Sequence, residues 1–248
     1  NVVSGNFIST YDWVPRYIER SKKYLDKGFT VFLVIHGSQP RYAIPDEISD
    51  VKRSVRFIRY HAADYGIDPN KLGITGSSAG GNLALIIGLS DDKPSDSKDP
   101  VDHVSARVQA VGVFYPPTDF LNYGMNNISP LQSDMMLRKQ GVAAAFDFKE
   151  WNDSTKTYTS ITIPEKRLEI AKEISPAYYV TSDDPPVYII HGDADIVVPI
   201  QQSKLLIKKL EEVKVPNHLM IVKGKGHGWK DQGIEEENLV NWFEKWLK

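Results

Sequence analysis

A glycine- and serine-rich pentapeptide in the first third of the chain has the residue types and spacing of a turn that carries a catalytic serine. The residues are Gly76-Ser77-Ser78-Ala79-Gly80, which match the pattern G-x-S-x-G. In that pattern small residues let the chain bend sharply between a strand and a helix, which exposes the hydroxyl of the central serine above a sheet. A match this short is more often a plain turn. We favour Ser78 as a nucleophile because an apolar, β-branched segment precedes it and an apolar segment at helical spacing follows it.

A serine hydroxyl needs an adjacent base, and a histidine near the end of the chain is the best candidate. His227 lies between glycines, in the loop that follows the apolar run 218–222. The other histidines lie at strand ends, in a helix or in polar segments, where structural or surface roles are expected; they are His36, His61, His103, His191 and His218. His227 is therefore the predicted general base.

Two acids that could orient this histidine follow another apolar run, 187–190. The chain order serine, acid, histidine is the order that a nucleophile of this kind uses. Asp195 is preferred because it lies deeper in the loop, where it can reach an imidazole on the neighbouring strand. Asp193 is expected to cap the backbone of its own turn.

The elements that must position these residues follow from the hydrophobic pattern. Continuous apolar runs predict buried strands at 29–35, 71–75, 108–115, 187–190 and 218–222. Amphipathic patterns predict helices at 13–27, from 46 to about 65, at about 200–213 and at 235–248. This alternation is typical of an α/β fold with a doubly wound, mostly parallel sheet, in which ligands bind beyond the carboxyl ends of the strands. We predict a single domain over residues 1–248.

Two segments interrupt the alternation of strands and helices. Residues 91–103 are rich in Asp, Lys, Ser and Pro and are expected to form a solvated loop. Residues 118–180 form a connection far longer than an ordinary one, and they contain Phe146, Phe148 and Trp151. We expect this insertion to form a small cap over the site.

Composition and motif searches exclude several classes of function. A net charge of −2 with scattered basic residues argues against a nucleic-acid partner. No apolar run approaches the ~18 to 20 residues of a membrane span. The chain has no cysteine, so a thiol nucleophile and thiolate metal sites are excluded. No metal-binding spacing, phosphate loop or dinucleotide fingerprint is present, and neither a metal nor a cofactor is expected.

The chain resembles the α/β-hydrolase superfamily, in the esterase/lipase branch that includes hormone-sensitive-lipase-like and feruloyl-esterase-like enzymes and is related to the prolyl oligopeptidase catalytic domain. Two blocks carry the resemblance: residues 65–84, which contain the pentapeptide, and residues 185–199, which contain the acids. Both are specific to the superfamily and say little about substrate. The resemblance implies Ser78 as nucleophile, Asp195 as acid, His227 as base and the Ala79 backbone N–H as one oxyanion donor.

The start of the chain departs from this family pattern. Members of the branch have a His-Gly-Gly loop after an early strand, which supplies further oxyanion donors. His36-Gly37-Ser38 is a tempting match, but it leads directly into the helix before the pentapeptide, and this is the wrong place in the order. When the chain is aligned with the family in this order, residues 3–6 come just after the place of the oxyanion loop, and the loop itself is missing. The sequence thus predicts that the first strands and the oxyanion loop are absent and that an upstream segment of the same protein completes the domain.

Together these patterns predict a serine carboxylic-ester hydrolase acting on small or aromatic-acyl esters through an acyl-enzyme, without a cofactor. Two alternatives stay open. The same triad could cleave amides, as in a prolyl oligopeptidase-like peptidase or an aryl formamidase. The chain could also be an inactive α/β-hydrolase module that only binds a ligand, which an absent oxyanion loop would favour.

Overall fold

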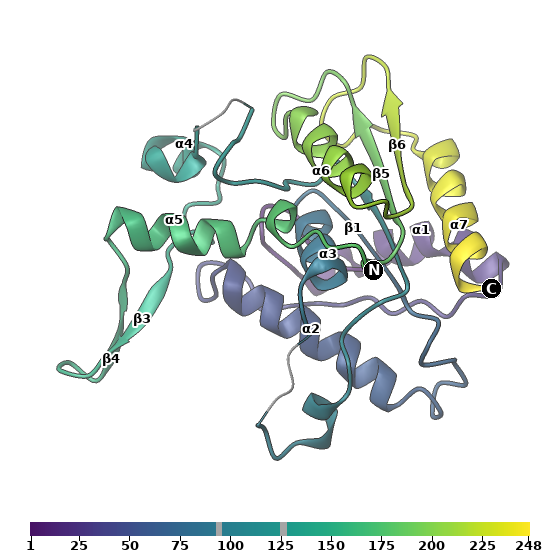
Figure 1. Cartoon of the computed structure of the whole chain (residues 1–248), viewed down its shortest axis with the longest axis horizontal. Coiled ribbons are helices and arrows are strands. Elements are labelled where there is room, and N and C mark those ends of the chain that lie inside the picture. Colours follow the sequence, from purple (N-terminus) through teal and green to yellow (C-terminus); the bar gives the residue numbers. More distant parts are fainter. Residues whose placement is uncertain (93–95, 125–127) are drawn as a thin grey trace.

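A parallel four-stranded sheet of order β1-β2-β5-β6 forms the centre of the chain (Figure 1). The computed structural model describes residues 1–92, 96–124 and 128–248. The strands are β1 (Gly73–Ser77), β2 (Ala110–Phe114), β5 (Val187–Gly192) and β6 (Asn217–Val222). All three neighbouring pairs are parallel, so the carboxyl ends of the four strands meet at one edge. The predicted α/β fold with a mostly parallel sheet is confirmed.

Helices cover both faces of this sheet, as the alternation of the side chains requires. On one face lie α2 (Ile44–Tyr60), α3 (Ala79–Leu89) and α6 (Gln201–Glu212); on the other lie α1 (Val14–Asp26) and α7 (Gly233–Leu247) (Figure 1). Val187 and Ile189 belong to the core on the α3 face. Tyr188 and Ile190 belong to the core beneath α7. Side chains one residue apart in β5 thus enter opposite cores, as expected of a strand buried on both faces.

The predicted strand at 29–35 is wrong in extent. This segment is extended but only half-buried, and within the described residues it forms a single β-bridge, between Val34 and Val2. Its backbone bonds run to residues 1–3 on one side: Val34 N–H donates to the Asn1 carbonyl, and Val3 N–H donates to the Val34 carbonyl. Val2 also bridges Gly76, so residues 1–3 lie between this segment and β1.

Other element boundaries differ from the predictions by a few residues. α2 begins at Ile44, two residues early, and ends at Tyr60, after which turns continue to Gly66. The first helix, α1, ends at Asp26, one residue before its predicted end, and Gly28 follows shortly after with a positive φ of 77°. Residues 91–103 include a short 3-10 helix, Pro100–His103, and Arg53 of α2 forms ion pairs with Asp99 and Asp102. This segment is therefore attached to α2 rather than merely solvated, although residues 93–95 lie outside the described part.

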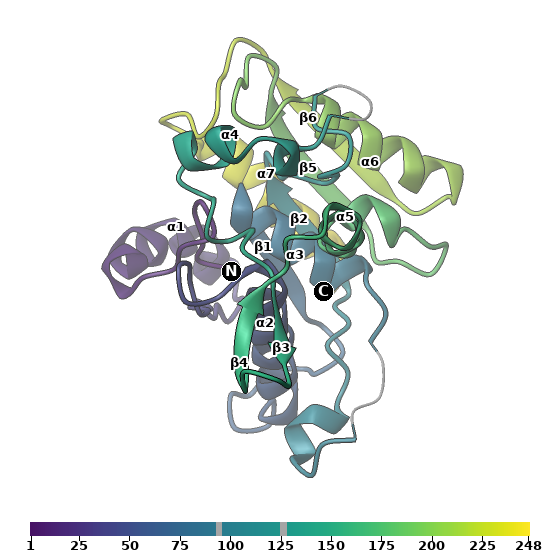
Figure 2. The ribbon, with the colours of Figure 1, turned by 90° about the vertical axis from the view of Figure 1, so that its left-hand side faces the viewer.

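The long connection between β2 and β5 has secondary structure of its own. It contains α4 (Asp134–Lys139), the antiparallel pair β3 (Lys149–Asn152) and β4 (Thr157–Ser160), and α5 (Pro164–Glu173). The β3–β4 hairpin projects away from the sheet (Figures 1 and 2). Phe120 and Phe146 of this connection pack around the ring of Phe7. Residues 125–127 of the predicted cap lie outside the described residues, and its role as a cap remains a prediction.

Candidate active site

Ser78 lies on a strained turn between β1 and α3, where the pentapeptide predicts a nucleophile. Its φ and ψ are 54° and −121°, a backbone conformation that is rare for a residue with a side chain. The Ser78 N–H donates to the Phe114 carbonyl at 2.9 Å, which ties the turn to β2. A Cβ added to Gly76 would lie 2.3 Å from the Gly80 carbonyl oxygen, so only glycine fits there. The local sequence therefore places the Ser78 hydroxyl above the carboxyl end of the sheet.

The structure brings the three predicted side chains into one hydrogen-bonded chain. His227 Nε2 lies 2.9 Å from Ser78 Oγ. On the other side of the ring, His227 Nδ1 lies 2.8 Å from Asp195 Oδ2. Because a carboxylate only accepts, Nδ1 carries the proton in this pair, and Nε2 is left to accept from the Ser78 hydroxyl. The arrangement is that of a nucleophile, a base and a group that orients the base.

Asp195 is held as a carboxylate by the donors around it. Burial would raise its pKa, but the hydrogen bonds from His191, His227 and the Val198 N–H outweigh burial and hold the pKa of Asp195 well below its usual range. Its Oδ1 accepts from the N–H groups of Val197 and Val198, each at 2.9 Å. Such a carboxylate stays ionised and keeps its lone pairs directed at the His227 ring.

Two residues that the sequence did not single out contact this group. His191, expected to be a structural histidine, is fully buried, and its Nε2 lies 2.9 Å from the Val198 carbonyl and 3.4 Å from Asp195 Oδ2. The Tyr115 ring lies against the His227 ring, with centroids 4.7 Å apart. Tyr115 has a positive φ of 36° directly after β2, a conformation that the sequence does not predict for a tyrosine.

The other candidates lie away from the group, as the sequence predicts. Asp193 Oδ1 accepts from the Gly224 N–H at 2.6 Å, so it caps the neighbouring loop rather than its own turn. His61 pairs with Asp64, and His103 contacts the Ser97 carbonyl. Among the described residues no group of three or more His, Cys, Asp or Glu side chains is placed to hold a metal. In the same part of the chain, no helix combines the length and the apolar character needed to cross a membrane.

The start of the chain corrects the prediction that residues 3–6 come after the position of an oxyanion loop. Because Val2 bridges Gly76 of β1, Ser4 to Ile8 directly follow a strand position beside β1 and themselves occupy that place. Gly5 and Ile8 exchange backbone hydrogen bonds at 3.0 and 2.9 Å, and Asn6 and Phe7 between them have φ of 51° and 58°. Two positive φ values between paired residues define a type I′ turn. We call Gly5–Ile8 the N-terminal turn.

This turn starts beside the first turn of α3. A Cβ added to Gly80 would lie 2.8 Å from the Val2 carbonyl oxygen and 3.4 Å from Ser4 Cβ. The Ala79 N–H opens the same helical turn. This segment contains no His-Gly-Gly pattern, and a bulky residue such as Phe7 rarely has a positive φ. The segment was therefore not identified from the sequence.

The first residues of the long connection attach to the loop that carries Asp195. The Tyr123 hydroxyl donates to the Val197 carbonyl at 3.0 Å, and the Gly124 N–H donates to Gln201 Oε1 at 3.1 Å. Ile196, in the same loop, is 93% exposed. An exposed apolar side chain thus lies next to the acid in the sequence.

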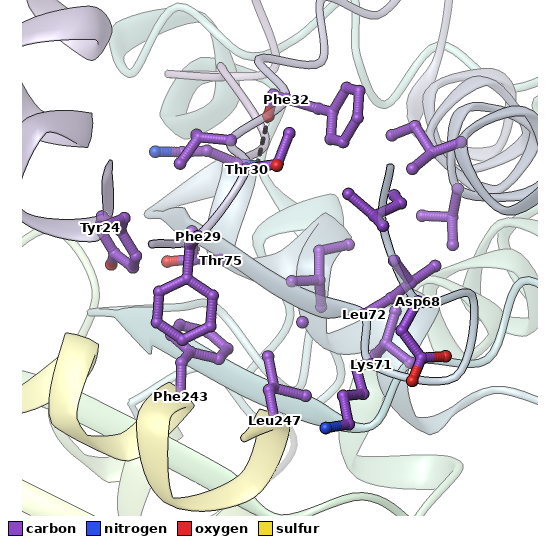
Figure 3. A pocket seen from close by; sticks show the side chains of 18 of the residues that line it. Tyr24, Phe29, Thr30, Phe32, Asp68, Lys71, Leu72, Thr75, Phe243 and Leu247 are labelled. Carbon is purple, nitrogen blue, oxygen red and sulfur yellow. Dashed lines mark hydrogen bonds between the residues drawn. The ribbon is translucent and has the colours of Figure 1, made fainter. Parts of the chain in front are cut away.

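The pocket in Figure 3 lies at the opposite ends of the strands. It has a volume of about 320 Å³ and is lined by the segment after α1, by the beginning of β1 and by the end of α7. Phe29, Phe243 and Leu247 line it, together with residues 73–75. Since Ser78 follows the carboxyl end of β1, this pocket is separate from the serine.

A sequence model of one protein family matches most of the chain. BD-FAE matches residues 13–210, which include Ser78 and Asp195. The chain belongs to the BD-FAE family. It is an α/β-hydrolase of the esterase/lipase branch, as the motif blocks implied.

Relatives and solved structures agree with this assignment. The probable carboxylic ester hydrolase LipM of Mycobacterium tuberculosis is 28% identical over 75% of this chain and 38% of its own length. The structure described as a truncated form of a carbohydrate esterase from gut microbiota is 26% identical, with a TM-score of 0.78, over 98% of this chain and 83% of its own. A bifunctional GH43-CE protein of Bacteroides eggerthii is also 26% identical, with a TM-score of 0.79, over 100% of this chain and 33% of its own. The chain spans about two fifths of the length of curated relatives such as LipM.

Proposed function

We propose that this chain is a serine carboxylic-ester hydrolase in which Ser78, His227 and Asp195 act as nucleophile, base and orienting acid. One observation carries the proposal: His227 joins the other two side chains through its two ring nitrogens, at 2.9 and 2.8 Å. The relatives' names support ester rather than amide chemistry, since LipM and LipQ are described as an ester hydrolase and an esterase.

The geometry defines the proton path of this reaction. His227 Nε2 takes the Ser78 Oγ proton as Oγ bonds to the ester carbonyl carbon, and Asp195 stabilises the imidazolium. The tetrahedral oxyanion collapses, the alcohol leaves with the proton from Nε2, and an acyl-Ser78 ester remains. Water then attacks this ester and gives up its proton to Nε2, which returns the proton to Ser78 as the acid is released. No bound metal or redox step is needed to balance these steps.

In this proposal two sets of backbone donors stabilise the oxyanion of the tetrahedral intermediate. The Ala79 N–H opens α3, where the helix dipole also favours negative charge. The second set is the N-terminal turn. The Asn6 and Phe7 N–H groups form no hydrogen bond within the described residues. In this proposal the turn does the work of the loop that the sequence appeared to lack.

The substrate class that we propose is an ester of a small or aromatic acid, with the acyl group held beside the long connection. Aromatic side chains of the connection gather next to the N-terminal turn, because Phe120 and Phe146 pack on Phe7. The alcohol side of the ester is proposed to be a sugar hydroxyl. This choice rests on the two structural neighbours whose titles name carbohydrate esterase or GH43-CE proteins.

Covalent labelling of the serine tests the proposed function most directly. The protein and its Ser78→Ala variant are treated with a fluorophosphonate, and intact mass is recorded. We expect one adduct on the protein and none on the variant, together with a loss of ester turnover of about 10⁶-fold in the variant. A folded protein that forms no adduct would overturn the proposal. It would favour the alternative of an inactive α/β-hydrolase module that only binds a ligand.

A substrate panel then separates the remaining alternatives. Acetylated xylo-oligosaccharides, methyl ferulate, p-nitrophenyl acetate and matching anilides are compared by kcat/KM. Higher kcat/KM for the esters than for the anilides is expected. A preference for the anilides would instead support an amide-cleaving enzyme.

A further inference from the structure

We infer that Gln39 is a positioning residue, which fixes the orientation of the N-terminal turn and links it to the long connection. This inference rests on the proposed function, because it concerns how the second set of oxyanion donors is held. Gln39 belongs to the sequence His36-Gly37-Ser38-Gln39, whose glycine and histidine resemble an oxyanion motif but lie elsewhere in the chain order. The structure gives this segment a different task.

Gln39 binds the carbonyl groups of the two central residues of the N-terminal turn, Asn6 and Phe7. Its side-chain Nε2 donates to the Asn6 carbonyl at 2.6 Å. Its backbone N–H donates to the Phe7 carbonyl at 3.3 Å. Each peptide unit is planar and trans, so its N–H points away from its C=O. By holding the Asn6 carbonyl, Gln39 therefore also sets the direction of the Phe7 N–H.

The turn needs such support because its backbone is unfavourable. A bulky residue at positive φ is strained and persists only when its surroundings impose that conformation. Phe7 is 4% exposed, and its ring is enclosed by Phe120 and Phe146 at centroid distances of 6.5 and 6.0 Å. The ring contacts fix the side chain, and Gln39 fixes the peptide groups.

The same amide group also contacts the long connection. Gln39 Nε2 donates to the Gly141 carbonyl at 2.8 Å, and Gln39 Oε1 accepts from the Ala145 N–H at 3.2 Å. Asn6 Nδ2 contacts the Gln140 carbonyl at 3.4 Å, a second link between the same two segments. One side chain thus joins the turn beside Ser78 to residues 140–145, which follow α4. We expect the position of this part of the connection to influence the oxyanion donors through Gln39.

Steady-state kinetics of Gln39→Met test this role, since methionine keeps the length and removes every side-chain hydrogen bond. The matched control is Gln109→Met. Gln109 also bonds to a backbone group, accepting from the Leu72 N–H at 2.9 Å, but lies at the amino ends of β1 and β2. We expect Gln39→Met to lower kcat by about 10- to 100-fold, as a misplaced oxyanion donor would. KM should stay within about threefold, and Gln109→Met should leave both constants unchanged.

Two further measurements separate positioning from a general loss of folding. Thermal unfolding of both variants is recorded, and the rate of Ser78 phosphonylation is measured, because the phosphoryl oxygen uses the same donors. Slow but complete labelling in Gln39→Met, with a melting temperature close to that of Gln109→Met, would support the inference. If Gln39→Met does not fold, Gln39→Glu replaces it, since a carboxylate cannot donate to Asn6 or Gly141.

The outcomes distinguish the inference from the proposed function. An active wild-type protein whose kcat is unchanged in Gln39→Met, or whose loss lies in KM alone, overturns the role of Gln39 and leaves the triad intact. A wild-type protein without turnover or adduct overturns the proposed function, and the inference falls with it.

Discussion

Asp195 and His191 form a buried pair whose protons are fixed by their neighbours. The Val198 carbonyl can only accept, so His191 Nε2, 2.9 Å away, carries a proton, and this N–H also faces Asp195 Oδ2 at 3.4 Å. His191 Nδ1 then accepts from the Ser203 hydroxyl at 2.6 Å. The acid is therefore held by a second histidine as well as by His227, and His191 supports the site without touching the serine.

We predict that His191→Phe raises the pKa of Asp195. The substitution removes one hydrogen-bond donor to the carboxylate, while burial still disfavours its charged form. A carboxylate with a lowered native pKa stabilises the fold above its unfolded value of about 3.9 and loses that contribution as the pH falls. In His191→Phe the pKa of Asp195 in the folded state is lowered less, so the variant should be less stable than the wild type above pH ~4. Its acid unfolding should begin at higher pH. Urea unfolding followed between pH 3 and 8 measures both effects.

His61→Phe is the matched control for this substitution, since His61 pairs with Asp64 at the surface near the end of α2. It should leave acid unfolding unchanged. If the two variants have the same pH profile of stability, His191 does not support Asp195 electrostatically.

The sequence predicted the three side chains that the structure brings together, but not those that hold them. Ser78, Asp195 and His227 could be found because each follows an apolar strand and because their order is characteristic. His191 and Tyr115 contact the group only through the packing of neighbouring strands, which no spacing along the chain encodes. Gln39 and Phe7 meet across 32 positions of sequence, so only the folded chain reveals that contact.

At the level of elements, the first turn of α2 contains an unusual buried acid. Glu47 is fully buried, and neither carboxyl oxygen has a hydrogen-bond partner among the described residues. His36 Nδ1 lies 3.7 Å from Glu47 Oε2. Burial, followed by the charges of Asp46 and Asp50, raises the pKa of Glu47 to about 9. Burial lowers the pKa of His36, so the pair is neutral at neutral pH.

Glu47→Gln should therefore stabilise the protein increasingly as the pH rises. Below the unfolded pKa of about 4.5 both states bind the Glu47 proton and the substitution has little electrostatic effect. Between about 4.5 and 9 the folded state keeps a proton that the unfolded state loses, so stability falls by about 1.4 kcal/mol per pH unit. Melting temperatures at pH 5, 7 and 8.5 should diverge between protein and variant. Glu165→Gln, on the exposed first turn of α5, is the control and should show no divergence.

The sequence predicted most elements because their apolar patterns are complete within the element. β2, β5 and α6 each have a continuous or periodic apolar face, and their ends fell within a few residues of the prediction. Residues 29–35 have the same apolar pattern but pair only with residues 1–3, so the pattern alone overstated the strand. A strand depends on its neighbours, which a local pattern does not show.

For the whole molecule, the pocket at the amino ends of the strands coincides with the start of the chain. The Asn1 amino group, which lines this pocket, donates to the Phe32 carbonyl at 2.8 Å. Burial lowers the pKa of this amine to about 5. The pocket lies between residues 29–32 and 73–75, where a strand continuing backwards from Asn1 would run. A strand joined to Asn1 by extension of the chain would therefore lie in this pocket.

Extending the chain at its amino end tests whether this pocket accepts a strand. An amine with a lowered native pKa contributes stability above its unfolded pKa of about 8 and loses it as the pH falls toward 5, so the free chain should weaken by about 1.4 kcal/mol per unit between these values. Addition of Ser-Gly-Ser replaces the amine with an amide and should abolish this dependence.

Addition of Val-Ile-Val should do the same and also fill the apolar pocket, and each buried side chain is worth about 1.5 to 3 kcal/mol. We expect the melting temperature at pH 6 to rise from the free chain to the polar extension and again, by several degrees, to the apolar one. Equal melting temperatures for the two extensions would show that the pocket does not accept a strand, and the region beside Phe29 and Phe243 would then need a different occupant.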